Sequence, residues 1–179
     1  MVKLPEEFRY SVFVVDIYAV LRYNIYINNL KGLSVNIMIY SAFPTMITPM
    51  THDNRIDIGA VRAMCDWYAE AGCGGIFTAC QSSEIFDLTV EERVLLTQTV
   101  VDRVNEIAVQ HPEKPRMKVV ASGHVSDTFE EQVYELTAVA EAGIDTLILI
   151  SNRMDIKNTG DDAWIAETSR LMEAIPDIS

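Results

Sequence analysis

The chain has 179 residues, of which 49% are hydrophobic and 22% are charged, and its formal net charge is −12. This length and composition are ordinary for one globular domain with a substantial core. An acidic surface repels phosphate backbones and anionic lipids, so neither a nucleic acid nor a membrane surface is expected as a partner.

The cysteines and histidines do not form a metal-binding or disulfide pattern. Cys65, Cys73 and Cys80 contain no CxxC pair, and the three histidines are scattered along the chain. Zinc sites and disulfide-rich domains show closer or more regular spacings. We therefore expect no metal, no cofactor and a reduced, cytoplasmic location.

Residues 1–41 are expected to form an atypical N-terminal extension, because they show neither a helical nor an alternating apolar period. The apolar stretch 11–21 contains Asp16, and the charges before it cancel, which is not typical of a signal peptide. Residues 33–50 are uncharged but contain two prolines, which argues against a membrane-spanning helix.

From residue 43 onward, apolar runs typical of strands alternate with amphipathic helical patterns. The helical period is clear at Ile58, Val61 and Cys65, and it recurs in the later segments. Such alternation predicts right-handed crossovers and a parallel sheet. The expected strands cover about 43–48, 75–80, 118–122 and 146–151, with a helix after each and the fourth helix over about 161–174.

Helix ends are marked by two kinds of signal. The Thr-x-x-Glu sequences at 89–92 and 128–131 predict capping boxes, in which side chains satisfy unpaired helix-end donors. A repeated Ala-Glu-Ala-Gly sequence at 69–72 and 140–143 precedes an apolar strand each time. Its glycine suits the left-handed position that ends a helix.

The pattern gives about four β/α units, whereas a complete eight-unit barrel takes about 250 residues. Four units cannot close such a barrel. An open, flavodoxin-like sheet is therefore an alternative that the pattern alone leaves open.

Several runs together resemble the dihydrodipicolinate synthase and N-acetylneuraminate lyase family, over about residues 42–179. The resemblance implies an α/β fold, namely a partial TIM (β/α)₈ barrel that corresponds to the N-terminal half of the family's domain. The runs are FPTMITPM (43–50), NRID (54–57), EAGCGGIF (70–77), LTVEER (88–93), VVASG (119–123) and AEAGID (140–145).

The family resemblance also implies a class I aldolase-type lyase or synthase acting on pyruvate or a related 2-keto acid. In that family a lysine on strand six forms a Schiff base, and the iminium withdraws electrons from the neighbouring carbon. A hydroxyl-rich loop after strand two holds the substrate carboxylate. No lysine of this chain matches the motif, so we expect the Schiff-base lysine beyond Ser179 and leave the catalytic residues of this chain unknown.

The loop after the second strand reads Cys80-Gln81-Ser82-Ser83-Glu84, where the family commonly has Gly-Thr-Thr-Gly-Glu. Adjacent hydroxyls and backbone N–H groups at such a turn can bind a carboxylate. The resemblance therefore implies Gln81, Ser82 and Ser83 as substrate-binding residues. A serine-capped turn without a ligand is the alternative.

After the fourth strand the chain departs from the family, because Ser-Asn-Arg-Met stands where the family has a Pro-Tyr-Tyr-like run. Arg153 could pair with a substrate carboxylate, or it could be a solvated loop arginine. His124, at the end of the third strand, is a further candidate substrate contact, with a packing role as its alternative. The missing tyrosine favours a branch that acts on a different 2-keto acid.

Two hypotheses about function follow. In the first, the parent protein makes or breaks a carbon–carbon bond through a keto-acid Schiff base, and a full-length form is a homo-oligomer, as the family's tetramers are. In the second, the 179-residue chain is a truncated non-catalytic fragment or an interaction partner of full-length subunits. A third class, a phosphate-binding α/β enzyme, is disfavoured because no GxGxxG or GxxxxGK loop occurs.

The extension carries one hypothesis of its own. Residues 30–32 resemble the family's usual lead-in to strand one, and residues 33–41 interrupt it. A transcript that lacks the codons for this stretch would support an artefact of gene prediction, and one that contains them would exclude it.

Overall fold

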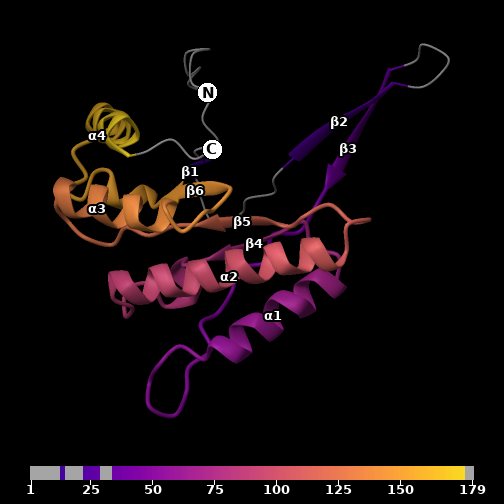
Figure 1. Cartoon of the computed structure of the whole chain (residues 1–179). Coiled ribbons are helices and arrows are strands. Elements are labelled where there is room, and N and C mark those ends of the chain that lie inside the picture. The colour runs from indigo at the N-terminus through magenta and orange to yellow at the C-terminus, as the bar shows by residue number, and fades with distance from the viewer. Residues whose placement is uncertain (1–12, 15–21, 29–33, 176–179) are drawn as a thin grey trace.

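The structure, a computed structural model, describes residues 13–14, 22–28 and 34–175 (Figure 1). It is a mixed α/β arrangement in which helices cover a parallel sheet. The strands are β1 (Phe13–Val14), β2 (Arg22–Asn28), β3 (Ser34–Tyr40), β4 (Gly75–Thr78), β5 (Lys118–Ala121) and β6 (Thr146–Leu149). The helices are α1 (Ile58–Glu70), α2 (Val90–Gln110), α3 (Phe129–Ala140) and α4 (Asp161–Ala174), with short 3₁₀ helices η1 (Gln81–Ser83) and η2 (Ser151–Arg153).

The main sheet has the order β1-β6-β5-β4, and each pairing in it is parallel. In register, Phe77 lies beside Val120, and Val120 lies beside Thr146. The order of β4, β5 and β6 in the sheet therefore follows their order in the chain, as the alternating pattern predicts. All three strands have their carboxyl ends at one edge of the sheet.

The strand expected over about 43–48 forms only in part. Thr45 makes an isolated parallel bridge to Phe77, and the Met46 N–H donates to the Phe77 carbonyl at 2.8 Å. The segment thus pairs with the correct neighbour without becoming a regular strand. Pro44 explains this, because a proline has no N–H to donate to a ladder.

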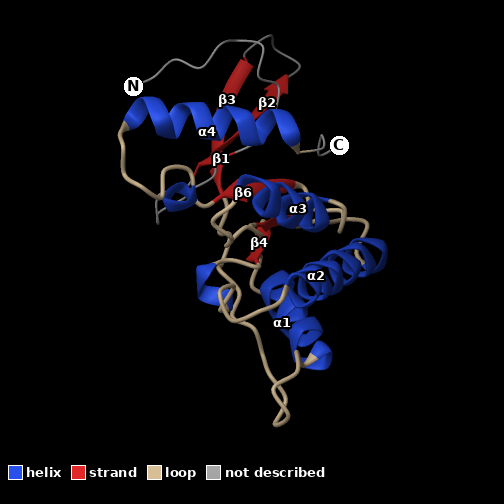
Figure 2. Cartoon of the chain, turned by 90° about the vertical axis from the view of Figure 1, so that its left-hand side faces the viewer, coloured by secondary structure: helices blue, strands red, loops and turns tan. Residues whose placement is uncertain are grey.

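The helices follow one another in chain order along the sheet. In both views α4, α3, α2 and α1 are stacked in sequence down the molecule (Figures 1 and 2). A doubly wound sheet would instead reverse its strand order at a switch point and place the helices of its two halves on opposite faces. The described part of the chain is therefore an arc of a barrel, and the flavodoxin-like alternative is wrong.

Two predicted helix starts form differently. At α2 both bonds of the capping box are present, since the Glu92 N–H donates to Thr89 Oγ1 at 3.2 Å and the Thr89 N–H donates to Glu92 Oε2 at 2.8 Å. At α3 the Glu131 N–H donates to Thr128 Oγ1 at 3.3 Å, but the hydroxyl of Thr128 donates to the Glu131 carboxylate at 2.6 Å. The second capping box is thus only half formed.

The predicted helix ends are confirmed. Gly72, directly after the Ala71 cap of α1, and Gly143, two residues after the Glu141 cap of α3, have φ of +75° and +85°. This left-handed backbone is strained for residues with a side chain but open to glycine. Each glycine reverses the chain toward the start of a strand, β4 or β6.

The core lies between the sheet and the helices. On α3, the residues that face the core are not all members of the apolar stripe of this helix. Phe129 and Val133, which are apolar residues at helical spacing, are half-buried, whereas Gln132 and Glu135 are only 4% and 3% exposed. The helix is rotated toward its polar residues because they find hydrogen-bond partners beneath the loop after β5.

Before residue 41 the structure describes β1 and an antiparallel pair, in which Arg22 of β2 lies beside Tyr40 of β3. The hypothesis that residues 30–32 lead into strand one involves residues outside the described ranges. The boundary between a 1–41 extension and a 42–179 domain stays a prediction. Across the described ranges, no helix is both long and apolar enough to cross a membrane.

Candidate functional site

The loop after β4 presents polar groups at the carboxyl edge of the sheet. Gln81 and Ser82 are exposed there, while Ser83 is fully buried. Two non-glycine residues with left-handed backbone flank the loop, Ala79 with φ +45° and Glu84 with φ +58°. Such conformations cost about 1–3 kcal/mol and cluster at functional turns.

The buried hydroxyl of Ser83 fixes this loop to the segment at Met46, which follows the isolated bridge between Thr45 and Phe77. Ser83 Oγ donates to the Met46 carbonyl at 2.5 Å and accepts the Cys80 N–H at 3.1 Å. Thr48 Oγ1 in turn donates to the Ser83 carbonyl at 2.7 Å. Ser83 thereby holds the loop in place, and the exposed polar side chains of this turn are those of its neighbours.

Arg153 reaches the same edge from the other side, in η2 after β6. Its Nη1 donates to Asp127 Oδ1 at 2.7 Å, and its guanidinium carbon lies 5.4 Å from the ring centre of Phe86. The structure therefore brings the loop after β6 against the loop after β4, as the prediction of a shared site requires. Arg153 Nε is buried without a hydrogen-bond partner.

His124 lies between the ends of β5 and β6 and is fully buried. Its Nε2 accepts the Ile150 N–H at 2.6 Å, and its Nδ1 lies 2.8 Å from Gln132 Oε1. Burial lowers the pKa of His124 below its ordinary value, although the hydrogen bond to Gln132 acts in the opposite direction. Both ring nitrogens therefore bind groups of the protein. A direct substrate contact by His124 stays a prediction.

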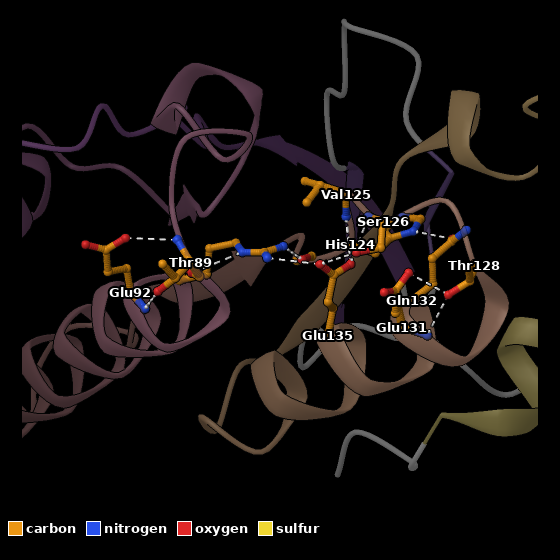
Figure 3. Close-up of polar contacts among 11 residues, drawn as sticks. Thr89, Glu92, His124, Val125, Ser126, Thr128, Glu131, Gln132 and Glu135 are labelled. Carbon is orange, nitrogen blue, oxygen red and sulfur yellow. Dashed lines mark hydrogen bonds and ion pairs between the residues drawn. The ribbon is translucent and has the colours of Figure 1, made fainter.

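A buried ion pair beneath the loop after β5 was not foreseen from the sequence. Arg93 and Glu135, both 4% exposed at the side chain, approach to 3.0 Å. Glu135 also accepts the N–H groups of Val125 and Ser126, and Arg93 donates to the Gly123 carbonyl. Figure 3 shows these loop residues gathered around Glu135 and His124.

Burial would raise the pKa of Glu135, but the backbone N–H groups of Val125 and Ser126 and the guanidinium of Arg93 lower it below the ordinary value. Glu135 is therefore ionised and fully engaged with protein groups. Polar helix residues normally predict a solvated face, so the sequence offered no signal for this pair. The role of the pair is seen only from its contacts, because both residues bind backbone groups of the loop after β5.

The buried side-chain polar atoms that lack a partner, within the described ranges, all lie at the carboxyl edge of the sheet. They are Thr78 Oγ1 at the end of β4, Ser122 Oγ directly after β5 and Arg153 Nε after β6. Native proteins leave few such atoms, and each calls for an explanation. Their common location marks this edge as the candidate site.

The chemistry that this edge can support is recognition of an anion. It offers amide and hydroxyl groups from Gln81 and Ser82 in the loop after β4, together with the guanidinium of Arg153 in the loop after β6. Within the part of the chain that the structure describes, no group of three or more His, Cys, Asp or Glu residues is placed to hold a metal ion. Lys118 lies at the opposite edge, where it pairs with Asp145 at 2.9 Å.

These features define a class: a parallel α/β arc with polar loops at the carboxyl ends of its strands, which is where barrel enzymes bind their substrates. Comparison with known proteins gives the particular family. Residues 38–111 match the model of the dihydrodipicolinate synthetase family. The resemblance is therefore confirmed over that part of the chain.

Individual proteins extend the match. A 4-hydroxy-tetrahydrodipicolinate synthase of Cellvibrio japonicus is 30% identical over 115 residues, which cover 64% of this chain and 36% of that protein. The pyruvate-complexed, chloride-inhibited dihydrodipicolinate synthase of Acinetobacter baumannii has a TM-score of 0.62 at 18% identity, covering 75% of this chain and 42% of that one. A prophage protein of the dihydrodipicolinic acid synthase family from E. coli K12, in complex with pyruvate, has a TM-score of 0.59 at 19% identity. The match covers 74% of this chain and 41% of that one.

The structural matches confirm the predicted fold class, a partial TIM barrel with parallel strands. The chain spans about 36% of the length of the curated relative described above and about 42% of the solved barrels.

Proposed function

We propose that this chain carries the carboxylate-binding edge of an aldolase-type lyase that acts on pyruvate or a related 2-keto acid. The observation that carries the proposal is the junction of two loops, with Arg153 stacked on Phe86 of the segment after β4 that also contains the exposed Gln81 and Ser82. Structural neighbours described as complexes with pyruvate support the choice of ligand.

The proposed roles differ among the predicted residues. Gln81 and Ser82 would donate hydrogen bonds to the substrate carboxylate, and Arg153 would supply a bidentate, charged partner for it. Ser83, whose hydroxyl binds Met46 and Cys80, would set the shape of the turn. The arginine replaces the family's tyrosine-rich run, so the preferred substrate is a 2-keto acid other than that of the named synthases.

The Schiff-base lysine is proposed from the family resemblance to lie on a sixth barrel strand, which is not among the described strands. A lysine amine attacks the keto carbon, water leaves, and the resulting iminium accepts the electron pair released at the neighbouring carbon. The described units would therefore bind and orient the keto acid, and the reacting amine would come from a further β/α unit.

A second candidate function is that of a non-catalytic fragment or an interaction partner of full-length subunits. Its support is the share of the relatives that the chain spans, about 36% of the Cellvibrio japonicus protein. The full-length form is proposed to be a cytoplasmic homo-oligomer. The two candidates differ in whether the chain itself binds a keto acid.

Pyruvate binding, followed by amide chemical shifts, tests the proposal. Loss of charged hydrogen bonds costs about 1.5–3 kcal/mol, so Arg153→Gln is expected to weaken binding about tenfold or more. The matched control is Arg170→Gln, because Arg170 also stacks on a phenylalanine, Phe129, but lies on α4. Equal binding by both variants would contradict the proposal.

Borohydride trapping with pyruvate, followed by intact mass, tests where the lysine lies. We expect no adduct on the 179-residue chain and a reduced pyruvate adduct on a longer form that supplies the sixth strand. An adduct on the 179-residue chain would overturn the placement of the lysine.

A further inference from the structure

His124 links the loops after β5 and β6 through α3. Its Nε2 accepts the Ile150 N–H at 2.6 Å, and its Nδ1 contacts Gln132 Oε1 at 2.8 Å. Gln132 Nε2 in turn lies 3.5 Å from the carbonyl of Arg153. A continuous series of contacts therefore runs from the imidazole to the backbone of the arginine proposed to bind the substrate. Figure 3 shows its first two members, His124 and Gln132.

The backbone determines the direction of each of these hydrogen bonds. The Ile150 N–H can only donate, so His124 Nε2 must be unprotonated. The proton of the neutral ring is then on Nδ1, which donates to Gln132 Oε1. That contact turns the Gln132 amide so that its Nε2 donates toward the Arg153 carbonyl.

We propose that His124 is a positioning residue, whose neutral imidazole holds the loop after β6 so that Arg153 faces the carboxylate of the 2-keto acid. This inference rests on the proposed function. It assigns His124 a role through Gln132 and Ile150, because both nitrogens of the fully buried ring already bind these protein groups.

Protonation would disrupt this arrangement. A proton on Nε2 would set two donors against each other, since the Ile150 N–H already points at that atom. The charged groups around the ring come from three elements: Glu135 on α3, Arg93 on α2 and Arg153 after β6. Glu135 is already paired with Arg93 and with two loop N–H groups, so it leaves little attraction for a positive imidazole.

Burial lowers the pKa of His124, so the ring is neutral at neutral pH and the change falls on the acidic side of the ordinary histidine value of about 6.5. Pyruvate stays anionic over this range. Binding of pyruvate should therefore weaken as the pH falls through the pKa of His124, which a separate histidine NMR titration measures.

Two variants separate positioning from packing. His124→Gln keeps an acceptor and a donor but cannot titrate, and His124→Phe keeps a ring but removes both hydrogen bonds. We expect His124→Gln to bind pyruvate with little pH dependence between pH 5 and 7, roughly the histidine range. His124→Phe should bind about tenfold more weakly at every pH, the cost of losing a buried hydrogen-bonded anchor. A wild-type pH profile retained in His124→Gln would overturn the proposal.

A ligand-free arm tests the positioning role even if pyruvate does not bind. Ring ¹⁵N shifts of the wild type should show the Nδ1–H tautomer. The Ile150 amide and the Arg153 Nε–H signals should move in His124→Phe, with the Arg170 Nε–H signal as an internal control. An Nε2–H tautomer, or an unmoved Arg153 signal, would refute the positioning role.

If this arm succeeds and neither pyruvate nor a larger 2-keto acid binds at any pH, the proposed function fails and the link from His124 to Arg153 stands. Should His124→Phe not fold, the wild-type tautomer and the pH profile of His124→Gln still support or overturn the positioning role.

Discussion

The two edges of the parallel sheet hold their polar groups in different ways. At the carboxyl edge, Arg93 and Glu135 form an ion pair that is 4% exposed on both sides, and His124 is fully buried. At the amino edge, Asp145 pairs with Arg116 and Lys118, whose side chains are 30% and 49% exposed. The first arrangement is closed to water, and the second shares its charges with solvent.

The difference bears on function. A buried polar group contributes little net stability, because its desolvation cost offsets much of its attraction. It does hold its partners in one geometry, since any other arrangement leaves a buried charge or donor unpaired. The closed network lies beneath the loop after β5, and through His124 it binds the start of the loop that carries Arg153, so we expect it to maintain the shape of both loops. The open pairs join the residues just before β6 to the start of β5.

The largest expected effect comes from Glu135→Ala. The change leaves the Arg93 guanidinium buried without its carboxylate and frees two loop N–H groups, so we expect a loss of about 3–5 kcal/mol in the free energy of unfolding. Urea denaturation measures it. Glu130→Ala, at an exposed position on the same helix, is the control and should change stability by less than about 0.5 kcal/mol.

A loss of only about 1 kcal/mol for Glu135→Ala would contradict the comparison, because that is the scale of an exposed pair. In that case the carboxyl edge would be open to water in solution.

Asp145→Asn should have a smaller effect. Asp145 accepts Arg116 Nη1 at 2.6 Å, Lys118 Nζ at 2.9 Å and the Val119 N–H at 2.8 Å. The amide can still accept one of these bonds, and solvent can satisfy the cations, so the expected cost is about 1–2 kcal/mol. Thermal or urea unfolding at pH 7 gives the value.

The pH dependence of this cost follows from the pKa of Asp145. Burial raises it, but the bonds from Arg116, Val119 and Lys118 outweigh burial and lower it below the ordinary value. The stabilisation is thus present above the ordinary aspartate pKa, about 3.9, and is lost as the pH falls through the lowered value. The difference between wild type and Asp145→Asn should therefore shrink in acid. A difference that grows below pH 4, roughly that ordinary value, would contradict the assignment.

How far the sequence predicts the molecule depends on how local each signal is. Helix starts and ends were predictable because Thr89, Gly72 and Gly143 act on backbone groups within a few residues. The fourth helix began and ended as its pattern indicated, at 161–174. The strand expected over about 43–48 was only partly predictable. Its apolar residues indicated a strand, but they did not show that Pro44 would interrupt the ladder of hydrogen bonds.

The candidate site was less predictable for a physical reason. The loops with Gln81 and Arg153 could be placed at one edge, because parallel strands share their carboxyl ends. The partners of His124 and Glu135 could not be identified from the sequence, because Gln132 and Arg93 lie on helices whose rotation is decided by tertiary packing. A polar residue in a helical pattern predicts solvent exposure, and only its contacts show otherwise.

The smallest effect, without any change in stability, is a difference in cysteine labelling between the two edges. Cys73 lies just before β4 and is partly exposed, whereas Cys80 lies just after it at 4% exposure, with Sγ 3.3 Å from Ser83 Oγ. Cys65 is fully buried, and burial together with Asp66 raises its pKa to about 12, so it should not react either.

With iodoacetamide under native conditions, Cys73 should be modified about tenfold or more faster than Cys80, because a buried thiol reacts only after local opening. Peptide mass spectrometry measures both rates, and labelling in denaturant shows that all three thiols can react. Cys73→Ser should leave the native chain almost unlabelled. Equal rates at Cys73 and Cys80 would show that the loop after β4 opens readily, and the closed carboxyl edge would then be no more rigid than the amino edge.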